Sequence, residues 1–166
     1  MELALAKSKY LETWGSLATH WGINRTMAQI HALLLVAPEP MSAENIMDQL
    51  QVSRGNTNMN LRALLEWGIV EKKLIPGERR EFFAAKKDIW ELFKQIAKER
   101  RRREIEPVIS VLDELKTLED NSLEGQEFQK IVTEIASVTK KLNKIVDLAI
   151  QSDEHWLMGK MTDIIK

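Results

Sequence analysis

In the middle of the chain the hydrophobic pattern leaves the helical period for a short stretch and then returns to it. Up to about residue 68, apolar side chains recur every three or four positions, as in amphipathic helices. The stretches 69–74 and 79–84 are instead β-branched, charged or aromatic, and they flank the turn Pro76-Gly77-Glu78. After Asp88 the helical pattern returns. Two isolated strands are only marginally stable, so this hairpin must pack on the helices around it.

Four helices are expected before the hairpin, and local signals set their ends. Ser, Thr and Asp before a periodic run are N-cap residues, whereas Gly and Pro end helices. The expected helices are 2–20, closed by Gly22; 26–37, capped by Thr26 and stopped by Pro38; 43–50, capped by Ser42; and 53–67, capped by Ser53 and closed by Gly68.

Long helices are expected after the hairpin. Asp88 is the predicted N-cap of a helix that runs to about residue 118, and Pro107 should kink or restart it. A short last helix is expected over 158–165. Between them, apolar residues alternate at three- and four-residue spacing, which is the a/d seam of a coiled coil: Phe128, Ile131, Ile135, Val138, Leu142, Ile145 and Ala149.

Composition excludes several classes of protein. A chain of 166 residues forms one medium domain, or a small domain with an extension. It has no Cys, so a thiolate zinc site, a cysteine nucleophile and a disulfide are excluded. The three His lack metal-ligand spacing, and no phosphate loop or nucleophile motif occurs, so we expect neither a metal nor an enzyme. Without a bilayer-spanning apolar run or a signal-peptide pattern, we expect a soluble cytoplasmic protein with no membrane partner.

Charge is distributed unevenly along the chain. The formal net charge is −1, yet the segment 53–104 has fourteen basic and eight acidic residues. A basic middle between acidic ends suggests a module that binds a polyanion. The alternative is a chance cluster of charges on a solvated surface.

The helix expected at 53–67 carries an unusual set of polar residues. Leu61, Leu64, Leu65 and Thr57 share one face, while Arg54, Asn58 and Arg62 lie opposite, with Asn56 and Asn60 at the margins. Asn disfavours helix, so three of them suggest a use for the amides. Asn matches the adenine edge in the major groove, and Arg matches the guanine edge. Gly55 in the first turn lets the helix start approach a phosphate closely. The alternative is a poorly optimised surface helix.

The hairpin tip carries two adjacent arginines. An arginine at such a tip can enter the minor groove, where narrow A·T tracts concentrate negative potential. One of the pair could instead bridge Glu78 or Asp88 and fix the loop. We therefore predict that one arginine contacts DNA and the other holds the loop. The complete set of predicted DNA-contacting residues is Ser42, Ser53, Arg54, Gly55, Asn56, Thr57, Asn58, Asn60, Arg62, Arg79 and Arg80.

Short helix, tight turn, second helix and hairpin follow each other in the order of a winged helix-turn-helix. The predicted fold is mainly α: a winged helix-turn-helix domain with a two-stranded β-hairpin wing and long N- and C-terminal dimerisation helices. The predicted segments are 1–22, an N-terminal helix for the dimer or core; 23–87, the DNA-binding domain; and 88–166, a long linker helix with a C-terminal helical dimerisation region.

The segments from Ser53 to Val70 and from Pro76 to Phe83 resemble the GbsR branch of the MarR-type transcriptional regulators. The resemblance is densest over residues 20–110 and weak in the C-terminal third. It implies a dimeric winged-helix regulator whose recognition helix enters the major groove and whose wing reaches the minor groove. These roles fall to Ser53–Arg62 and to Arg79 and Arg80. Glu78 stands where many relatives have Asp.

A single winged helix contacts few base pairs, so affinity needs two half-sites. The expected dimer surface is the seam at Phe128, Ile131, Ile135, Val138, Leu142 and Ile145, together with the apolar face of residues 2–20. Packing within one chain is the alternative for both. A two-fold dimer predicts a pseudo-palindromic operator.

Aromatic residues near the first helix suggest an effector site. Tyr10, Trp14 and Trp21 could form a box that holds a quaternary ammonium group by cation–π attraction. The resemblance to the GbsR branch makes choline or glycine betaine the ligands to consider. The alternative is that these rings are core or interface anchors. No other cofactor is expected.

Together these features predict a sequence-specific, double-stranded DNA-binding transcriptional regulator: a dimeric repressor, released by a small osmolyte-type effector. The alternative is a winged-helix module that binds protein partners and does not read DNA.

Overall fold

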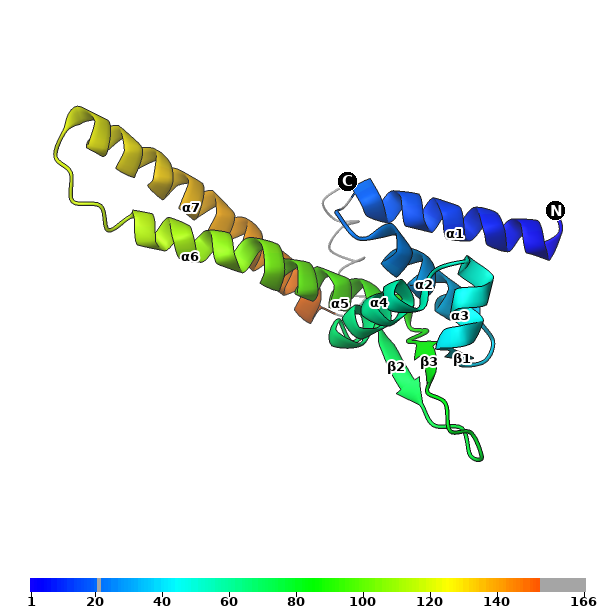
Figure 1. Cartoon of the computed structure of the whole chain (residues 1–166). Helices are drawn as coiled ribbons and strands as arrows, with labels where there is room; N and C mark the ends of the chain where they lie inside the picture. The colour runs from blue at the N-terminus through cyan, green and yellow to red at the C-terminus, as the bar shows by residue number, and fades with distance from the viewer. Residues whose placement is uncertain (21, 153–166) are drawn as a thin grey trace. The chain divides into compact units, whose positions relative to one another are not determined.

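The computed structural model describes residues 1–20 and 22–152. The chain divides into two compact units, Met1–Leu92 and Phe93–Lys166 (Figure 1). Trp21 and the short helix expected over 158–165 lie outside the described residues.

Helix α2 lies at the centre of the first unit. It packs against α1, α4 and strand β3, and it also meets α3. Ile30 and Leu34 of α2 are almost fully buried, together with Ile46 of α3 and with Leu61 and Leu64 of α4. The elements of this unit are α1 (Leu3–His20), α2 (Arg25–Val36), β1 (Met41–Ser42), α3 (Ala43–Leu50), α4 (Arg54–Glu66), β2 (Val70–Lys73) and β3 (Phe82–Ala85). The predicted mainly helical winged helix-turn-helix fold is confirmed.

The helix starts follow local capping chemistry. Ser42 and Ser53 cap α3 and α4 as predicted, because each hydroxyl accepts a hydrogen bond from the backbone N–H three residues later. The prediction that Thr26 caps α2 is wrong. Asn24 is the N-cap, with its side-chain oxygen 3.1 Å from the N–H of Met27, and Thr26 lies inside the first turn.

The sheet has three antiparallel strands in the order β1-β3-β2. The short strand β1 was not expected; it pairs Met41 with Phe83 and so ties the start of α3 to the wing. Strand β3 begins three residues later than predicted, so Arg79 and Arg80 lie in the loop and not in the strand. The predicted turn is present: the N–H of Glu78 donates to the carbonyl of Ile75, and Gly77 has a φ of 85°.

The second unit contains a helical hairpin. Helix α5 (Ile89–Arg100) begins at the cap Asp88, whose carboxylate accepts from the N–H of Glu91 as predicted. A π-helical turn, Arg101–Ile105, then precedes α6 (Glu106–Leu115). Pro107 falls in the first turn of α6, where its missing N–H is tolerated, so the predicted restart is confirmed.

Helix α7 (Leu123–Gln151) runs beside α6 (Figure 1). A small core of Leu112, Val132 and Ala136 holds the two helices together. Polar contacts follow the same face of α7, where Lys140 pairs with Asp113 and Arg101 pairs with Asp147. Among the described residues, no helix combines the length and apolarity that crossing a membrane requires.

His31 makes the stability of the first unit depend on pH. The ring is 3% exposed, and its Nε2 has no hydrogen-bond partner among the described residues. Burial lowers the pKa of His31 from 6.5 to about 4. Between pH 6.5 and 4, His31 therefore binds a proton in the unfolded chain but stays neutral in the folded chain. The contribution of neutral His31 to the free energy of unfolding is therefore fully present above pH 6.5, and it is lost as the pH drops toward 4.

We expect this loss to reach about 3 kcal/mol by pH 4. Urea unfolding between pH 4 and 8 measures it, and His31→Gln should flatten that part of the profile. The exposed His20 provides the control, because His20→Gln should leave the profile unchanged. An unchanged slope in His31→Gln contradicts the assignment.

Candidate nucleic-acid interface

Helix α4 has a buried face and an exposed face. Thr57, Leu61 and Leu64 are 0–2% exposed and face α2 and α3. Arg54, Asn58 and Arg62, at four-residue spacing, are all exposed. The outward row predicted from the sequence is therefore present, with two cationic groups and one amide presented to solvent.

The outward row is largely free of partners. Asn58 and Arg62 make no hydrogen bond or ion pair with any other described residue. Arg54 has a side chain 71% exposed, and its one ion pair among the described residues is with the carboxylate of Glu44, at 3.8 Å. An amide and a guanidinium in this state can meet base edges without first breaking strong internal bonds.

Two residues predicted to contact DNA face inward. Asn60 is 3% exposed, and its amide donates to the carbonyl of Asn56 at 2.8 Å and to the side-chain oxygen of Asn56 at 2.7 Å. Thr57 is 0% exposed, and its hydroxyl donates to the carbonyl of Ser53. Neither side chain can reach a base edge from this position, so these predictions do not fit the structure.

Asn56 belongs to the same polar network. It is half-buried, and its amide donates to the hydroxyl of Thr26 on α2 at 3.3 Å. The hydrogen bonds from Thr26 through Asn56 to Asn60 link α4 to α2, which explains why α4 tolerates amides on this side. Of the three asparagines on α4, Asn58 is the exposed one.

The start of α4 is open to an approaching anion. Ser53 is exposed and caps the helix, and Gly55 follows in the first turn. A Cβ added to Gly55 would meet nothing within 4 Å. Packing within the chain therefore gives no reason for a glycine here, whereas close approach of a phosphate to the free N–H groups would.

Ser42, also predicted to contact DNA, is 1% exposed. Its hydroxyl accepts from the N–H of Asn45 at 3.2 Å and donates to the side-chain oxygen of Asn45 at 2.7 Å. Both hydrogen bonds stay inside α3, so Ser42 is a buried structural cap and the prediction does not fit.

The two wing arginines have different environments. Arg80 pairs with Glu78 at 3.2 Å and with Glu44 at 3.3 Å, and its guanidinium lies 5.8 Å from the ring centroid of Phe82. The hydrogen bonds that Arg80 donates to the carboxylates of Glu78 and then Glu44 raise the pKa of Arg80. Arg79 is exposed and has no ion pair with any other described residue. The geometry fits the expected division, in which Arg80 holds the loop and Arg79 is available to DNA.

Glu44 is a residue that the sequence did not single out. It lies in the first turn of α3, and its carboxylate contacts both Arg54 of α4 and Arg80 of the wing. These side chains line a depression of about 190 Å³ between α3, α4 and the wing, with Asn58 at its edge. An acidic residue at a helix start is ordinary, so only the fold reveals that Glu44 joins α4 to the wing loop.

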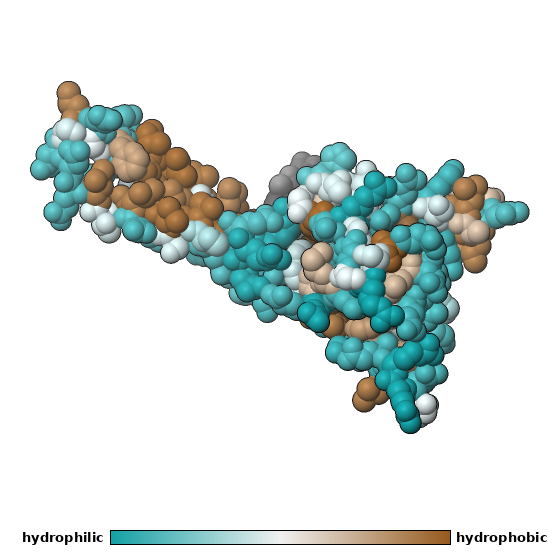
Figure 2. All heavy atoms as spheres, viewed as in Figure 1, coloured by the Kyte–Doolittle hydropathy of each residue, from teal (hydrophilic) through white to brown (hydrophobic). Residues whose placement is uncertain are grey.

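The predicted a/d seam is exposed along α7. Its six predicted dimer residues are 42–62% exposed: Phe128, Ile131, Ile135, Val138, Leu142 and Ile145. The packing against α6 uses a different face, which contains Val132 and Ala136. Figure 2 shows apolar side chains gathered on this helical hairpin. The described part of the chain thus leaves the seam unpacked.

Part of the predicted aromatic box is visible. The rings of Tyr10 and Trp14 are half-buried, and their centroids lie 5.8 Å apart at 39°. Burial raises the pKa of Tyr10. Trp21 lies outside the described residues, so the third wall of the box is not seen.

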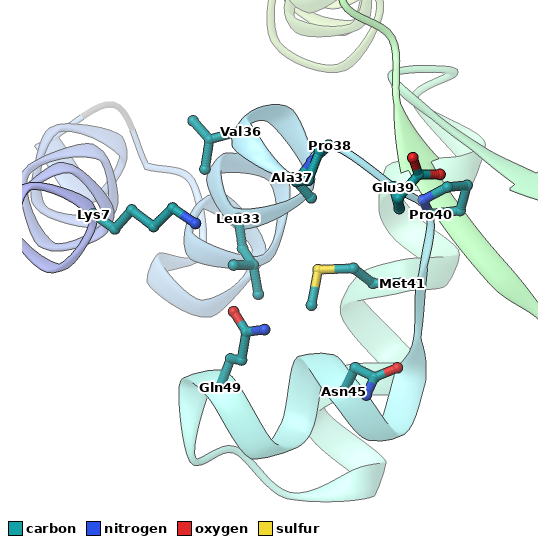
Figure 3. A pocket seen from close by; sticks show the side chains of 10 residues that line it. All are labelled: Lys7, Leu33, Val36, Ala37, Pro38, Glu39, Pro40, Met41, Asn45 and Gln49. Carbon is teal, nitrogen blue, oxygen red and sulfur yellow. The ribbon is translucent and has the colours of Figure 1, made fainter. Parts of the chain in front are cut away.

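A pocket of about 250 Å³ lies between α1, α2 and α3 (Figure 3). Leu33, Val36 and Met41 form its apolar part, while Lys7 and Gln49 contribute polar groups at its edge. The sequence did not predict this pocket, because it depends on how α1, α2 and α3 pack together.

Comparisons with known proteins relate the chain to transcriptional regulators. It is 29% identical over 76 residues to the HTH-type transcriptional regulator MmpR5 of Mycobacterium tuberculosis, an alignment that covers 45% of this chain and 46% of MmpR5. The chain thus spans less than half the length of that relative. No protein-family model matches the chain. The relatives found are regulators and not enzymes, which agrees with the expectation from the sequence.

One solved structure is similar to this chain in fold. The crystal structure of a transcriptional regulator superposes with a TM-score of 0.56 at 19% identity, over 86% of this chain and 98% of that one. A structure of a ZitR mutant from Lactococcus lactis gives a TM-score of 0.37 at 17% identity, over 85% and 97% of the two chains. The first of these likenesses supports the winged-helix fold.

Proposed function

We propose that this protein is a sequence-specific, double-stranded DNA-binding transcriptional regulator that acts in the cytoplasm. The observation that carries the proposal is the exposed row Arg54, Asn58 and Arg62 on α4, together with the exposed Arg79 of the wing, which has no ion pair with another described residue. In a winged helix, α4 would enter the major groove and the wing tip would reach the minor groove. The similarity to MmpR5 supports the same conclusion.

We further propose that the protein is a MarR-type repressor of the GbsR branch and that it works as a homodimer. The exposed seam of α7 supports the dimer, since its apolar residues are not covered by the described chain. A dimer would bind a pseudo-palindromic operator through two copies of α4.

A small osmolyte such as choline or glycine betaine is the proposed effector. The Tyr10–Trp14 ring pair supports it, because a quaternary ammonium group binds well against aromatic faces. Calorimetric titration of the full chain with each compound is the direct test.

The test of DNA binding is a titration of a labelled duplex, recovered from a randomised pool by the protein itself, in rising KCl. We expect binding that survives excess poly(dI-dC), with a log–log salt slope of roughly −7 to −9 if each subunit neutralises four or five phosphates. Failure to bind any duplex would instead favour a winged-helix module for protein partners.

A further inference from the structure

The carboxylate of Glu44 connects two elements that the proposed function uses together. It contacts Nη2 of Arg54 at 3.8 Å and Nη1 of Arg80 at 3.3 Å. The three residues come from α3, α4 and the wing loop, and Glu44 and Arg80 are 36 positions apart in sequence.

The backbone of Glu44 is held firmly on both sides. Ser42 caps α3 just before it, and strand β1 pairs Ser42 with Phe82 at the start of β3. Helix α3 also packs against α4. The backbone of Glu44 is therefore fixed relative to the elements that carry both arginines, and its carboxylate lies within reach of both guanidinium groups.

Stability does not explain this arrangement. The three side chains are 71%, 52% and 53% exposed, and ion pairs in water contribute little to folding. A negative charge on the face that would meet a polyanion also repels phosphate. A binder selected for affinity to any duplex would have a neutral residue here.

We propose that Glu44 is a specificity-determining positioning residue that raises the ratio of operator binding to non-specific DNA binding. It orders Arg54 and Arg80 before DNA arrives, so an operator that matches their placement binds to groups already in position. It also disfavours loose phosphate contacts on arbitrary duplex, where no base contact offsets the repulsion. This inference rests on the proposed DNA-binding function.

The matched pair of variants is Glu44→Gln and Asp48→Asn. Both remove one negative charge from an exposed side chain of α3, but Asp48 makes no side-chain bond to either arginine. The full chain is titrated with a duplex recovered from a randomised pool by the parent protein, and with poly(dI-dC), at the same salt concentration.

We expect Glu44→Gln to bind poly(dI-dC) about 3- to 10-fold more tightly, because a dimer loses two repulsive charges near the phosphates. Its affinity for the recovered duplex should stay the same or fall, so the ratio of operator affinity to poly(dI-dC) affinity should drop at least about 3- to 10-fold. Asp48→Asn should change both affinities by the same small factor. The melting temperature of Glu44→Gln should stay within about 2 °C of the parent value.

The inference is overturned, with DNA binding left intact, if Glu44→Gln and Asp48→Asn have the same ratio of operator affinity to poly(dI-dC) affinity. If the parent protein recovers no duplex from the pool, the proposed function fails as well. A drop in operator affinity that merely follows a lower melting temperature assigns Glu44 a structural role and also overturns the inference.

Discussion

Asn58→Ala should weaken DNA binding and Asn60→Ala should weaken folding, although both variants remove an amide from the same helix, two positions apart. Asn58 is exposed and unpaired within the described chain, so its loss should leave folding unchanged. It should weaken operator binding by about 1–3 kcal/mol per half-site and relax base preference at one position. Arg62→Ala should behave in the same way.

Asn60→Ala should instead destabilise the fold. Its buried amide donates twice to Asn56, and removing it takes away both hydrogen bonds, at a cost of about 1–3 kcal/mol. Its base preference should remain that of the parent. Urea unfolding and titration with base-substituted duplexes measure both quantities. The assignment of Asn58 to the exposed face and Asn60 to the buried face of α4 is contradicted if Asn58→Ala keeps the base preference of the parent. It is also contradicted if Asn60→Ala is fully stable and its base preference is relaxed.

The largest effect is expected from a charge in the seam of α7. Ile135 is 49% exposed in the middle of the predicted dimer surface. Ile135→Glu would bury two carboxylates against each other in a dimer, so the protein should become monomeric. Because the second half-site then no longer adds to binding, operator affinity should fall by about 10²–10⁴-fold.

Ser137→Glu is the control for this variant. It adds the same charge to an exposed position of α7 that lies outside the seam. It should remain dimeric and bind the operator like the parent. Sedimentation equilibrium gives the mass of each variant, and titration gives its affinity. A dimer that persists in Ile135→Glu would show that the seam is not the interface.

The sequence predicted best what depends on local chemistry. Ser42, Ser53 and Asp88 were identified as caps because a cap needs only a side-chain oxygen and a backbone N–H three residues later. The same rule failed at Asn24, since Asn24 and Thr26 both satisfy it and their spacing does not choose between them. The short strand β1 has no local signal, because its existence depends on Phe82 and Phe83.

The candidate site was only partly predictable for the same reason. Helical spacing placed Arg54, Asn58 and Arg62 on one side of α4, and the structure agrees. Helical spacing could not reveal that Asn56 bonds Thr26 on another helix, or that Asn60 bonds Asn56. Nor could it assign separate roles to the adjacent wing arginines, which depend on Glu44 at a distance of 36 residues.

The most direct measurement is the sequencing of a randomised duplex pool retained by the protein. If the outward side chains of α4 read base edges in a two-fold dimer, the pool should converge on a pseudo-palindrome whose half-sites are separated by about one helical turn. A retained pool that stays as random as the starting one would contradict the account.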